Sequence, residues 1–218
     1  DRYPPLARAA DQTADSYANT LQEVPITTAR PPTARLAPDR RPCARPAEGA
    51  PRTVAEALGQ IVWLLSQSPL HREMPLKDLE WSFMPPILKE QFRVFRFGTL
   101  PPLPGLDEAS PVFAGLTRQA LEQLPLGVAI WASLSEDAER KLEQGQRLEL
   151  EEWNSGDRLW LVEFITPFAQ PGNGLAAAML GDLLTGPFAG RSLSMHRTDP
   201  VTGRRDRVTL GGVPSQAA

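Results

Sequence analysis

Three side chains in this 218-residue sequence could take part in proton transfer. His71 is one of two histidines, and an imidazole that titrates at about pH 6.5 can both accept and return a proton near neutrality. Ser68, three residues earlier, could orient the ring or donate a hydrogen bond to a developing oxyanion. Glu163 lies within a nearly apolar run, where a carboxylate is costly to bury unless it has a partner. These residue types indicate general acid-base chemistry.

Each of these side chains also has an ordinary structural interpretation. A histidine that follows a helix can be a surface or capping residue, and Ser68 suits a hydrogen bond at a helix end. Glu163 could point to water from an edge strand. The second histidine, His196, falls in a predicted hairpin and is interpreted as structural. Spacing alone leaves these alternatives open.

Local sequence places His71 on a turn just beyond a helix. Thr53-Val54-Ala55-Glu56 has the pattern of a capping box, in which the Thr hydroxyl and the Glu carboxylate each satisfy a backbone amide. Pro69 ends the helix, because the residue before a proline avoids the helical region. The apolar face between these two points consists of Leu58, Ile61, Val62, Trp63 and Leu65.

The rest of the chain predicts a mixture of helices and a largely antiparallel sheet. Strands are predicted over 92–97, 126–134, 158–164, 191–197 and 205–210. Helices are predicted over 75–88 with an interruption at Pro85-Pro86, and over 116–124, 135–145 and 175–184. Residues 98–110 are rich in proline and predict a loop. The run 158–164 is typical of a central strand, and the order of elements indicates an α+β domain.

Composition and charge limit the function classes. A hydrophobic content of 41% supports one core. The net charge of -3, from 23 basic and 26 acidic residues, provides no field for holding nucleic acid, so that partner is excluded. The single cysteine, Cys43, cannot form an internal disulfide, which favours a reducing compartment. Two scattered histidines and one cysteine lack metal-ligand spacing, and no glycine-rich phosphate loop occurs, so we expect no bound metal or cofactor.

The chain is expected to be cytoplasmic and to have two parts. No window reaches the length of about 18 apolar residues that a membrane span needs, and the first residues have no apolar signal-peptide run. The first residue is not Met, so we expect the numbering to begin inside a longer product or after processing. Residues 1–52 are dense in Pro, Ala and Arg and predict a flexible extension, whereas 53–218 predict the folded domain.

Five blocks occur in an order that resembles one known family. They are Gly59 to Arg72 with its Ser-Pro-Leu-His-Arg end, Trp131-Ala132-Ser133-Leu134-Ser135, Glu152-Trp153-Asn154-Ser155-Gly156-Asp157-Arg158-Leu159-Trp160, Pro167-Phe168, and Arg197-Thr198-Asp199-Pro200 followed by Gly211-Gly212. Over roughly 54–213 the sequence is similar to the RTX toxin-activating lysine acyltransferases of the hemolysin-activating type.

The resemblance implies a fold, an activity and a site. The fold would be a single domain like that of the GNAT acetyltransferases. The activity would be transfer of a fatty acyl group from acyl carrier protein, the donor substrate, to an internal lysine of an RTX protoxin. His71 would be the catalytic base, and Glu163 would pair with the ring and stabilise the imidazolium. Ser68 would complete the catalytic set.

The sequence also departs from the family, and it leaves alternatives. Glu163 stands where the family has Asp, and the stretch 97–125 is longer than the family's connection. One alternative is an acyltransferase that uses the same donor on another protein or a small amine. Another is a non-catalytic protein that binds a toxin or acyl carrier protein. The oligomeric state stays open, a homodimer included.

Overall fold

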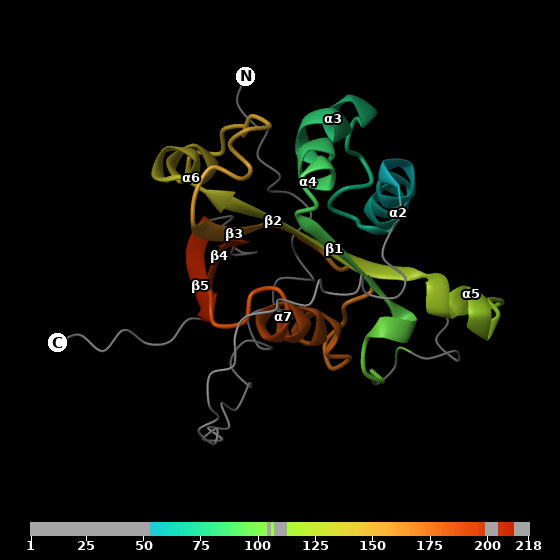
Figure 1. Ribbon diagram of the computed structural model, residues 1–218. Helices are drawn as coiled ribbons and strands as arrows, with labels where there is room; N and C mark the ends of the chain where they lie inside the picture. The colour runs from blue at the N-terminus through green and yellow to red at the C-terminus, as the bar shows by residue number, and fades with distance from the viewer. Residues whose placement is uncertain (1–52, 104–105, 107–112, 199–204, 212–218) are drawn as a thin grey trace, which may run out of the picture.

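A computed structural model describes residues 53–103, 106, 113–198 and 205–211. A five-stranded sheet lies at the centre, with helices on both sides (Figure 1). The strands are β1 (Phe92–Arg96), β2 (Pro125–Leu134), β3 (Arg158–Ile165), β4 (Ser192–Thr198) and β5 (Arg205–Gly211). The extension predicted over 1–52 and the turn predicted between the last two strands lie outside the described residues.

The sheet is mostly antiparallel, with the strand order β1-β2-β3-β4-β5. Antiparallel pairing joins β1 to β2, β2 to β3, and β4 to β5. The parallel pair is β3 with β4, where Trp160 lies opposite Ser194 and Leu161 opposite Met195. β3 is thus the central strand, as its apolar run predicts. The α+β class and the mostly antiparallel sheet are confirmed.

Helix α2 (Val54–Gln67) covers one face of the sheet and leads to His71. The backbone N–H of Glu56 donates to Thr53 Oγ1 at 3.1 Å, which confirms the predicted helix start. The buried side of the helix consists of Ala57, Ile61, Leu64 and Leu65. Ser68 caps the other end in an extended conformation, and Pro69 follows. The predicted helix end is therefore also confirmed.

The helical stretch between His71 and β1 differs in one respect from the prediction. It contains a 3-10 turn η1 (Leu76–Asp78) and two short helices, α3 (Leu79–Ser82) and α4 (Met84–Leu88). The break falls at Phe83, so the prediction that Pro85-Pro86 interrupts the helix was wrong. Both prolines lie in the first turn of α4, where backbone N–H groups have no partner within the helix and a proline loses nothing.

The remaining helical elements are η2 (Phe97–Thr99), α5 (Arg118–Gln123), α6 (Glu136–Glu143) and α7 (Leu175–Thr185). Helix α7 lies on the sheet face opposite α2 (Figure 1). It approaches β2 closely at Gly127, where a Cβ atom would come within 2.7 Å of the Met179 side chain. Odd-numbered β2 residues of this region therefore face α7, and even-numbered ones face α2.

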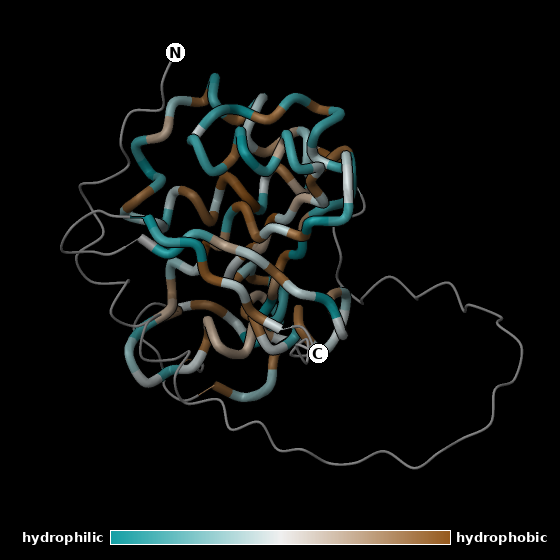
Figure 2. Tube along the Cα trace, turned by 90° about the vertical axis from the view of Figure 1, so that its left-hand side faces the viewer, coloured by the Kyte–Doolittle hydropathy of each residue, from teal (hydrophilic) through white to brown (hydrophobic). Residues whose placement is uncertain are grey.

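Hydrophobic positions gather where the helices face the sheet (Figure 2). The largest fully buried side chains include Trp160, Phe83, Phe95 and Ile130, which come from β3, the α3–α4 junction, β1 and β2. Side chains of both sheet faces thus contribute to the core. Among the described residues, no helix combines the length and apolar character needed to cross a membrane.

Candidate active site

Ser68 and His71 are held together by a tight turn at the end of α2. The backbone N–H groups of His71 and Arg72 both donate to the Ser68 carbonyl oxygen at 3.0 Å. This turn follows directly from the sequence, because Pro69 prevents the helix from continuing. It brings the side chains of residues 68 and 71 to the same side of the chain. Ser68 Oγ lies 2.8 Å from His71 Nδ1, a hydrogen-bonding distance.

Glu163 approaches the other nitrogen of the same ring. Its Oε2 atom lies 3.8 Å from His71 Nε2, close enough for attraction between charges but beyond a hydrogen bond. The His71 side chain is 12% exposed and that of Glu163 is 37% exposed, whereas Ser68 is buried. The structure therefore brings together all three residues that the sequence singled out. The carboxylate forms the side of the group that is open to solvent.

A bulge in β3 determines where Glu163 points. Leu161 pairs with Trp131 of β2, and Glu163 pairs with the neighbouring β2 residue, Ile130. Val162 is therefore an extra residue in the ladder. In a regular strand Trp160 and Glu163 would face opposite sides of the sheet, because side chains alternate. With the bulge, both lie opposite even-numbered β2 residues, on the α2 face. Bulges re-aim side chains in this way beside functional sites.

The loop before β3 is fixed to α6 and to the end of β2. Lys141 Nζ forms an ion pair with Glu152 Oε1, and the hydrogen bond from Lys141 lowers the pKa of the Glu152 carboxyl. The N–H of Glu149 donates to Glu152 Oε2 at 2.8 Å. Ser155 Oγ accepts from the Ser135 N–H at 2.9 Å and donates to the Glu152 carbonyl at 2.8 Å. The sequence block 152–160 thus anchors the strand that carries Glu163.

Gly156 is required in this loop because there is no room for a side chain. A Cβ atom would lie 2.5 Å from the Leu134 carbonyl oxygen and 2.7 Å from the Ser135 nitrogen, both backbone atoms. We expect Gly156→Ala to lower the free energy of unfolding by about 1–3 kcal/mol, the usual cost of overpacking. Denaturant melts measure this change.

Gly59→Ala is the matched control, because Gly59 is exposed within α2 and a Cβ there has nothing within 4 Å. It is expected to raise stability by up to about 1 kcal/mol, since alanine favours helix over glycine. Equal stability changes for the two variants would contradict the crowding at Gly156.

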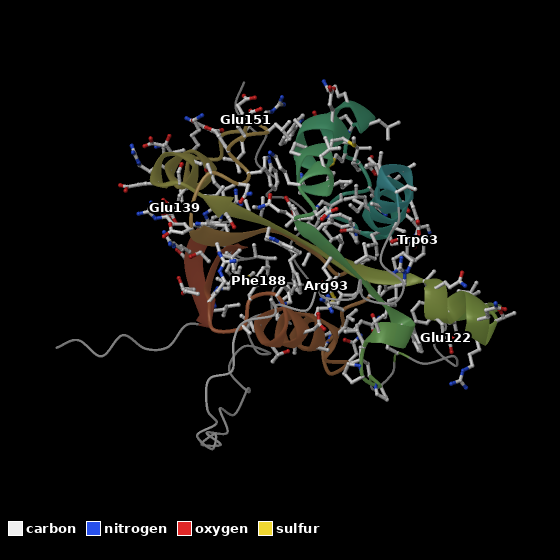
Figure 3. All side chains as sticks on the ribbon, viewed as in Figure 1. Trp63, Arg93, Glu122, Glu139, Glu151 and Phe188 are labelled. Atoms are coloured by element: carbon white, nitrogen blue, oxygen red, sulfur yellow. The ribbon has the colours of Figure 1, made fainter. Side chains whose placement is uncertain are left out.

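Glu139 on α6 joins β3 to the hairpin formed by β4 and β5. Its carboxylate accepts a hydrogen bond from Trp160 Nε1 at 2.7 Å and pairs with Arg158 Nε at 3.1 Å and Arg207 Nη2 at 2.9 Å. Its side chain is only 10% exposed and extends from α6 toward the sheet (Figure 3). Sequence reasoning missed this residue, because its partners are 19 or more positions away. A glutamate on a charged helix gives no signal of burial.

His196 packs against the same cluster, which supports its structural interpretation. Its ring lies 4.9 Å from that of Trp160, and Arg205 Nη2 lies 3.3 Å from Nδ1. Burial lowers the pKa of His196 below its ordinary value of 6.5, and the charge of Arg205 acts in the same direction. Arg207 lowers it further, while Glu143 opposes the shift. The folded chain therefore holds this proton less readily than the unfolded chain.

This shift predicts a loss of stability in acid. Because the unfolded chain binds the His196 proton more readily, unfolding takes up a proton once the pH falls below about 6.5. Stability due to neutral His196 is then lost progressively as the pH falls toward the lowered pKa. Between pH 7 and pH 5 we expect the melting temperature of the unmodified protein to fall more than that of His196→Phe, which keeps an aromatic ring on Trp160. The difference reflects the uptake of about one proton by His196 on unfolding. If the melting temperatures of the two proteins fell equally between pH 7 and pH 5, the lowered pKa of His196 would be contradicted.

A metal centre is not found at this site. Among the described residues, no group of three or more His, Cys, Asp and Glu side chains is placed to hold a metal ion. Arg93 and Phe188, which Figure 3 labels, lie between the sheet and α7, on the other face.

Comparison with known proteins agrees with the resemblance of the sequence blocks. The profile of the RTX toxin acyltransferase family matches residues 50–103 and 117–210. The chain is 28% identical over 112 residues to the RTX-II toxin-activating lysine-acyltransferase ApxIIC of Actinobacillus pleuropneumoniae, which is 51% of this chain and 55% of the relative. It is 32% identical over 114 residues to the leukotoxin-activating lysine-acyltransferase LtxC of Aggregatibacter actinomycetemcomitans, 52% and 54% of the two chains.

A third relative is the protein-lysine myristoyltransferase HlyC of Escherichia coli, 31% identical over 118 residues, with 54% of this chain and 55% of the relative covered. The chain spans about half the length of the curated relatives it matches. The family profile covers a larger part and leaves out 104–116, which lie within the stretch predicted to be longer than in the family. This chain belongs to the RTX toxin acyltransferase family.

Proposed function

We propose that this protein is a lysine acyltransferase that moves a fatty acyl group from acyl carrier protein to an internal lysine of an RTX protoxin. The observation that carries the proposal is the meeting of Ser68, His71 and Glu163 at the end of α2 and the centre of β3. Membership of the family supports it. So do the names of the relatives, which are a toxin-activating lysine-acyltransferase and a protein-lysine myristoyltransferase.

In the proposed reaction, His71 removes a proton from the acceptor lysine. We assign the ring proton to Nδ1, which lies 2.8 Å from Ser68 Oγ and donates to it in this mechanism, so that Nε2, on the side of Glu163, is the base. An incoming ammonium group is attracted to the Glu163 carboxylate and gives its proton to Nε2. The same carboxylate then stabilises the imidazolium, because opposite charges at about 4 Å attract by about 1–4 kcal/mol between water and a protein surface.

The amine nitrogen next attacks the thioester carbonyl carbon of the acyl donor. A carbon-nitrogen bond forms, the carbonyl oxygen carries the negative charge, and collapse of this intermediate breaks the carbon-sulfur bond. The imidazolium gives its proton to the leaving thiolate, and the neutral His71 ring then takes the second proton from the attached nitrogen and releases it to solvent, so the products are an amide, a free thiol and one proton. The Ser68 hydroxyl, which accepts from Nδ1, holds the ring in the orientation that presents Nε2 to the amine. No bound cofactor enters these steps.

The proposal includes a fold relationship and a location. An α+β domain with a central, mostly antiparallel sheet is compatible with the GNAT-like arrangement that the resemblance implies. The reaction is placed in the cytoplasm, where acyl carrier protein supplies acyl groups. Neither part is needed for the chemistry at His71.

The test is the intact mass of a candidate RTX protoxin after incubation with this protein and acyl carrier protein charged with a fatty acid. Addition of acyl mass at lysine supports the proposal. Consumption of the acyl donor with a different protein or amine, and none with protoxin, would support the alternative acceptor. Binding of protoxin or carrier protein without turnover would indicate a non-catalytic relative.

We also propose that residues 53–218 form the catalytic domain and that 1–52 are dispensable for the chemistry. The proposal is supported by the composition of the segment, which is rich in Pro and Arg and lacks the apolar periodicity of core elements. Limited proteolysis should trim the chain to near Arg52 and leave the transfer rate within about twofold of the full chain. Unfolding or inactivation of the trimmed protein would contradict this boundary.

A further inference from the structure

A cavity of about 360 Å³ lies beside the connection between β1 and β2, apart from His71. Its lining is mainly aliphatic and aromatic and includes Phe97, Leu103, Leu106, Leu121 and Leu126. The volume falls within the range of about 300–1,000 Å³ typical of small-molecule sites. Apolar cavities bind apolar molecules readily, because water gains little there.

Two charged residues on α5, Arg118 and Glu122, add the polar part of the lining. They pair with each other at 3.4 Å, and their side chains are 79% and 53% exposed. Figure 3 shows Glu122 on α5, at the outer end of the molecule. The charged groups therefore lie toward solvent, and the deeper part of the cavity is apolar.

The apolar wall is firmly built into the domain. Leu121 and Leu126 are each 1% exposed, and Leu106 is 6% exposed. Phe113 packs edge-on against Phe97 with ring centroids 6.1 Å apart, and it is itself only 2% exposed.

Part of this wall is particular to this chain. The family profile skips 104–116, and this interval contains the lining residue Leu106 as well as Phe113, which packs behind the lining residue Phe97. Phe113 also lies 5.6 Å from Phe168, whose ring is 5.7 Å from Trp63 on α2. Two of the described residues in this interval, Leu106 and Phe113, are thus buried in the domain, and Leu106 forms part of the cavity wall.

The cavity and the candidate active site both involve β2, at positions separated along the strand. Ile130 is the register partner of Glu163, and Leu126, which lines the cavity, is four residues earlier, at an irregularity in the pairing with β1. At about 3.3 Å per residue the separation is roughly 13 Å. One lipid acyl chain fills half of a bilayer core, or about 15 Å. The two lengths are similar.

We propose that this cavity binds the hydrocarbon chain of a fatty acyl ligand. The chain belongs either to the group being transferred or to a separate fatty acid, and both sources present the same saturated hydrocarbon to the Leu and Phe wall. The choice of a fatty chain rests on the proposed function. Binding is measured without transfer, so the two proposals can fail separately.

The first experiment titrates the full chain with myristate in a calorimeter. Leu103→Trp fills the cavity from its half-buried side, and Leu116→Trp is the matched control, since Leu116 is exposed in the same connection and outside the lining. We expect one saturable site that Leu103→Trp weakens by about 10-fold or more, because apolar pockets discriminate by about 10- to 200-fold per methylene. The control should bind like the unmodified chain.

Absence of saturable binding, or equal binding by Leu103→Trp and the control, would overturn the proposal. Should Leu103→Trp fail to fold by circular dichroism, Leu100→Trp fills the same cavity from another half-buried position. The same comparison then applies to that variant.

A second experiment separates the two sources of the chain. Transfer is measured with carrier protein charged with acyl groups of increasing length. If the cavity holds the transferred group, Leu103→Trp shifts the preferred length downward, and the control does not. If it holds a separate fatty acid, the length profile stays unchanged while myristate binding is lost. If Leu103→Trp changes neither the myristate binding nor the preferred acyl length, the proposal is overturned.

Discussion

Replacement of His71 by alanine is expected to lower the rate of lysine acylation by about 100- to 10,000-fold, the usual contribution of a proton-transfer residue. The side chain lies on a turn beyond α2 and contacts Ser68 and Glu163 through its two ring nitrogens. Because its removal leaves the buried face of α2 intact, the melting temperature should stay close to that of the unmodified chain. Single-turnover transfer from acyl carrier protein to protoxin measures the effect.

Two controls make this result specific. Raising the pH until the acceptor lysine is deprotonated should restore part of the rate in His71→Ala, because the base is then no longer needed. His196→Phe is the matched histidine variant, since His196 packs against Trp160 and has no place in the reaction. Its transfer rate at neutral pH should remain near that of the unmodified protein. Unmodified rates in His71→Ala, with lysine ionisation controlled, would remove His71 from the role of base.

The features of the site that are local in sequence could be predicted from it. The cap at Thr53, the helix end before Pro69 and the turn that holds Ser68 and His71 each depend on interactions between residues at most four apart. Backbone sterics and capping hydrogen bonds act at that range, so residue types alone determine them. The positions of two of the three candidate residues follow from such short-range rules.

The orientation of Glu163 could not be predicted from local sequence. It depends on the bulge at Val162, which arises from the register between β2 and β3 across more than 30 residues. Strict alternation would have placed Glu163 on the face opposite Trp160. Family resemblance identified the residue, but only the paired strands bring its carboxylate to His71. The burial and pairing of Glu139 could not be predicted for the same reason, since its partners come from β3 and β5.

The added residues between β1 and β2 illustrate a further limit. The sequence indicated a longer connection and predicted a loop there, because proline excludes regular structure. Nothing comparable in the sequence indicates that Leu106 and Phe113 are buried, since isolated apolar residues in a loop show no periodicity. The place of Phe113 is determined by packing against Phe97 and Phe168, from other parts of the chain.

Removing the charge of Glu163 with little change in shape is expected to lower the transfer rate by about 10- to 100-fold in Glu163→Gln. The carboxylate lies 3.8 Å from His71 Nε2 and is 37% exposed, so solvent screens part of its attraction for the imidazolium. This screening is why the effect should be smaller than that of His71→Ala. The melting temperature should change little, because a side chain with this exposure contributes little through ion pairing.

Glu163→Asp tests the length of the arm rather than its charge. It restores the residue that the family carries at this position, but it withdraws the carboxylate by one methylene from a ring already 3.8 Å away. The bulge at Val162 is part of a backbone that presents Glu, so the shorter side chain should not recover the full rate. We expect partial activity, above that of Glu163→Gln and below that of the unmodified chain. Single-turnover rates of the three proteins, measured at equal donor concentration, give the order.

The matched control for both variants is Glu80→Gln, which removes an exposed carboxylate from α3. It separates a local effect at the ring from a general effect of net charge on the encounter with acidic or basic partners, which acts over a Debye length of about 10 Å. Full activity in Glu163→Gln would make Glu163 a surface residue of β3 and would favour the non-catalytic alternative. The role of Glu163 in stabilising the imidazolium is supported if Glu163→Gln is slow, Glu163→Asp is intermediate and Glu80→Gln has the unmodified rate. Only a charge close to Nε2 can explain that order, because Glu80→Gln removes the same charge elsewhere on the surface.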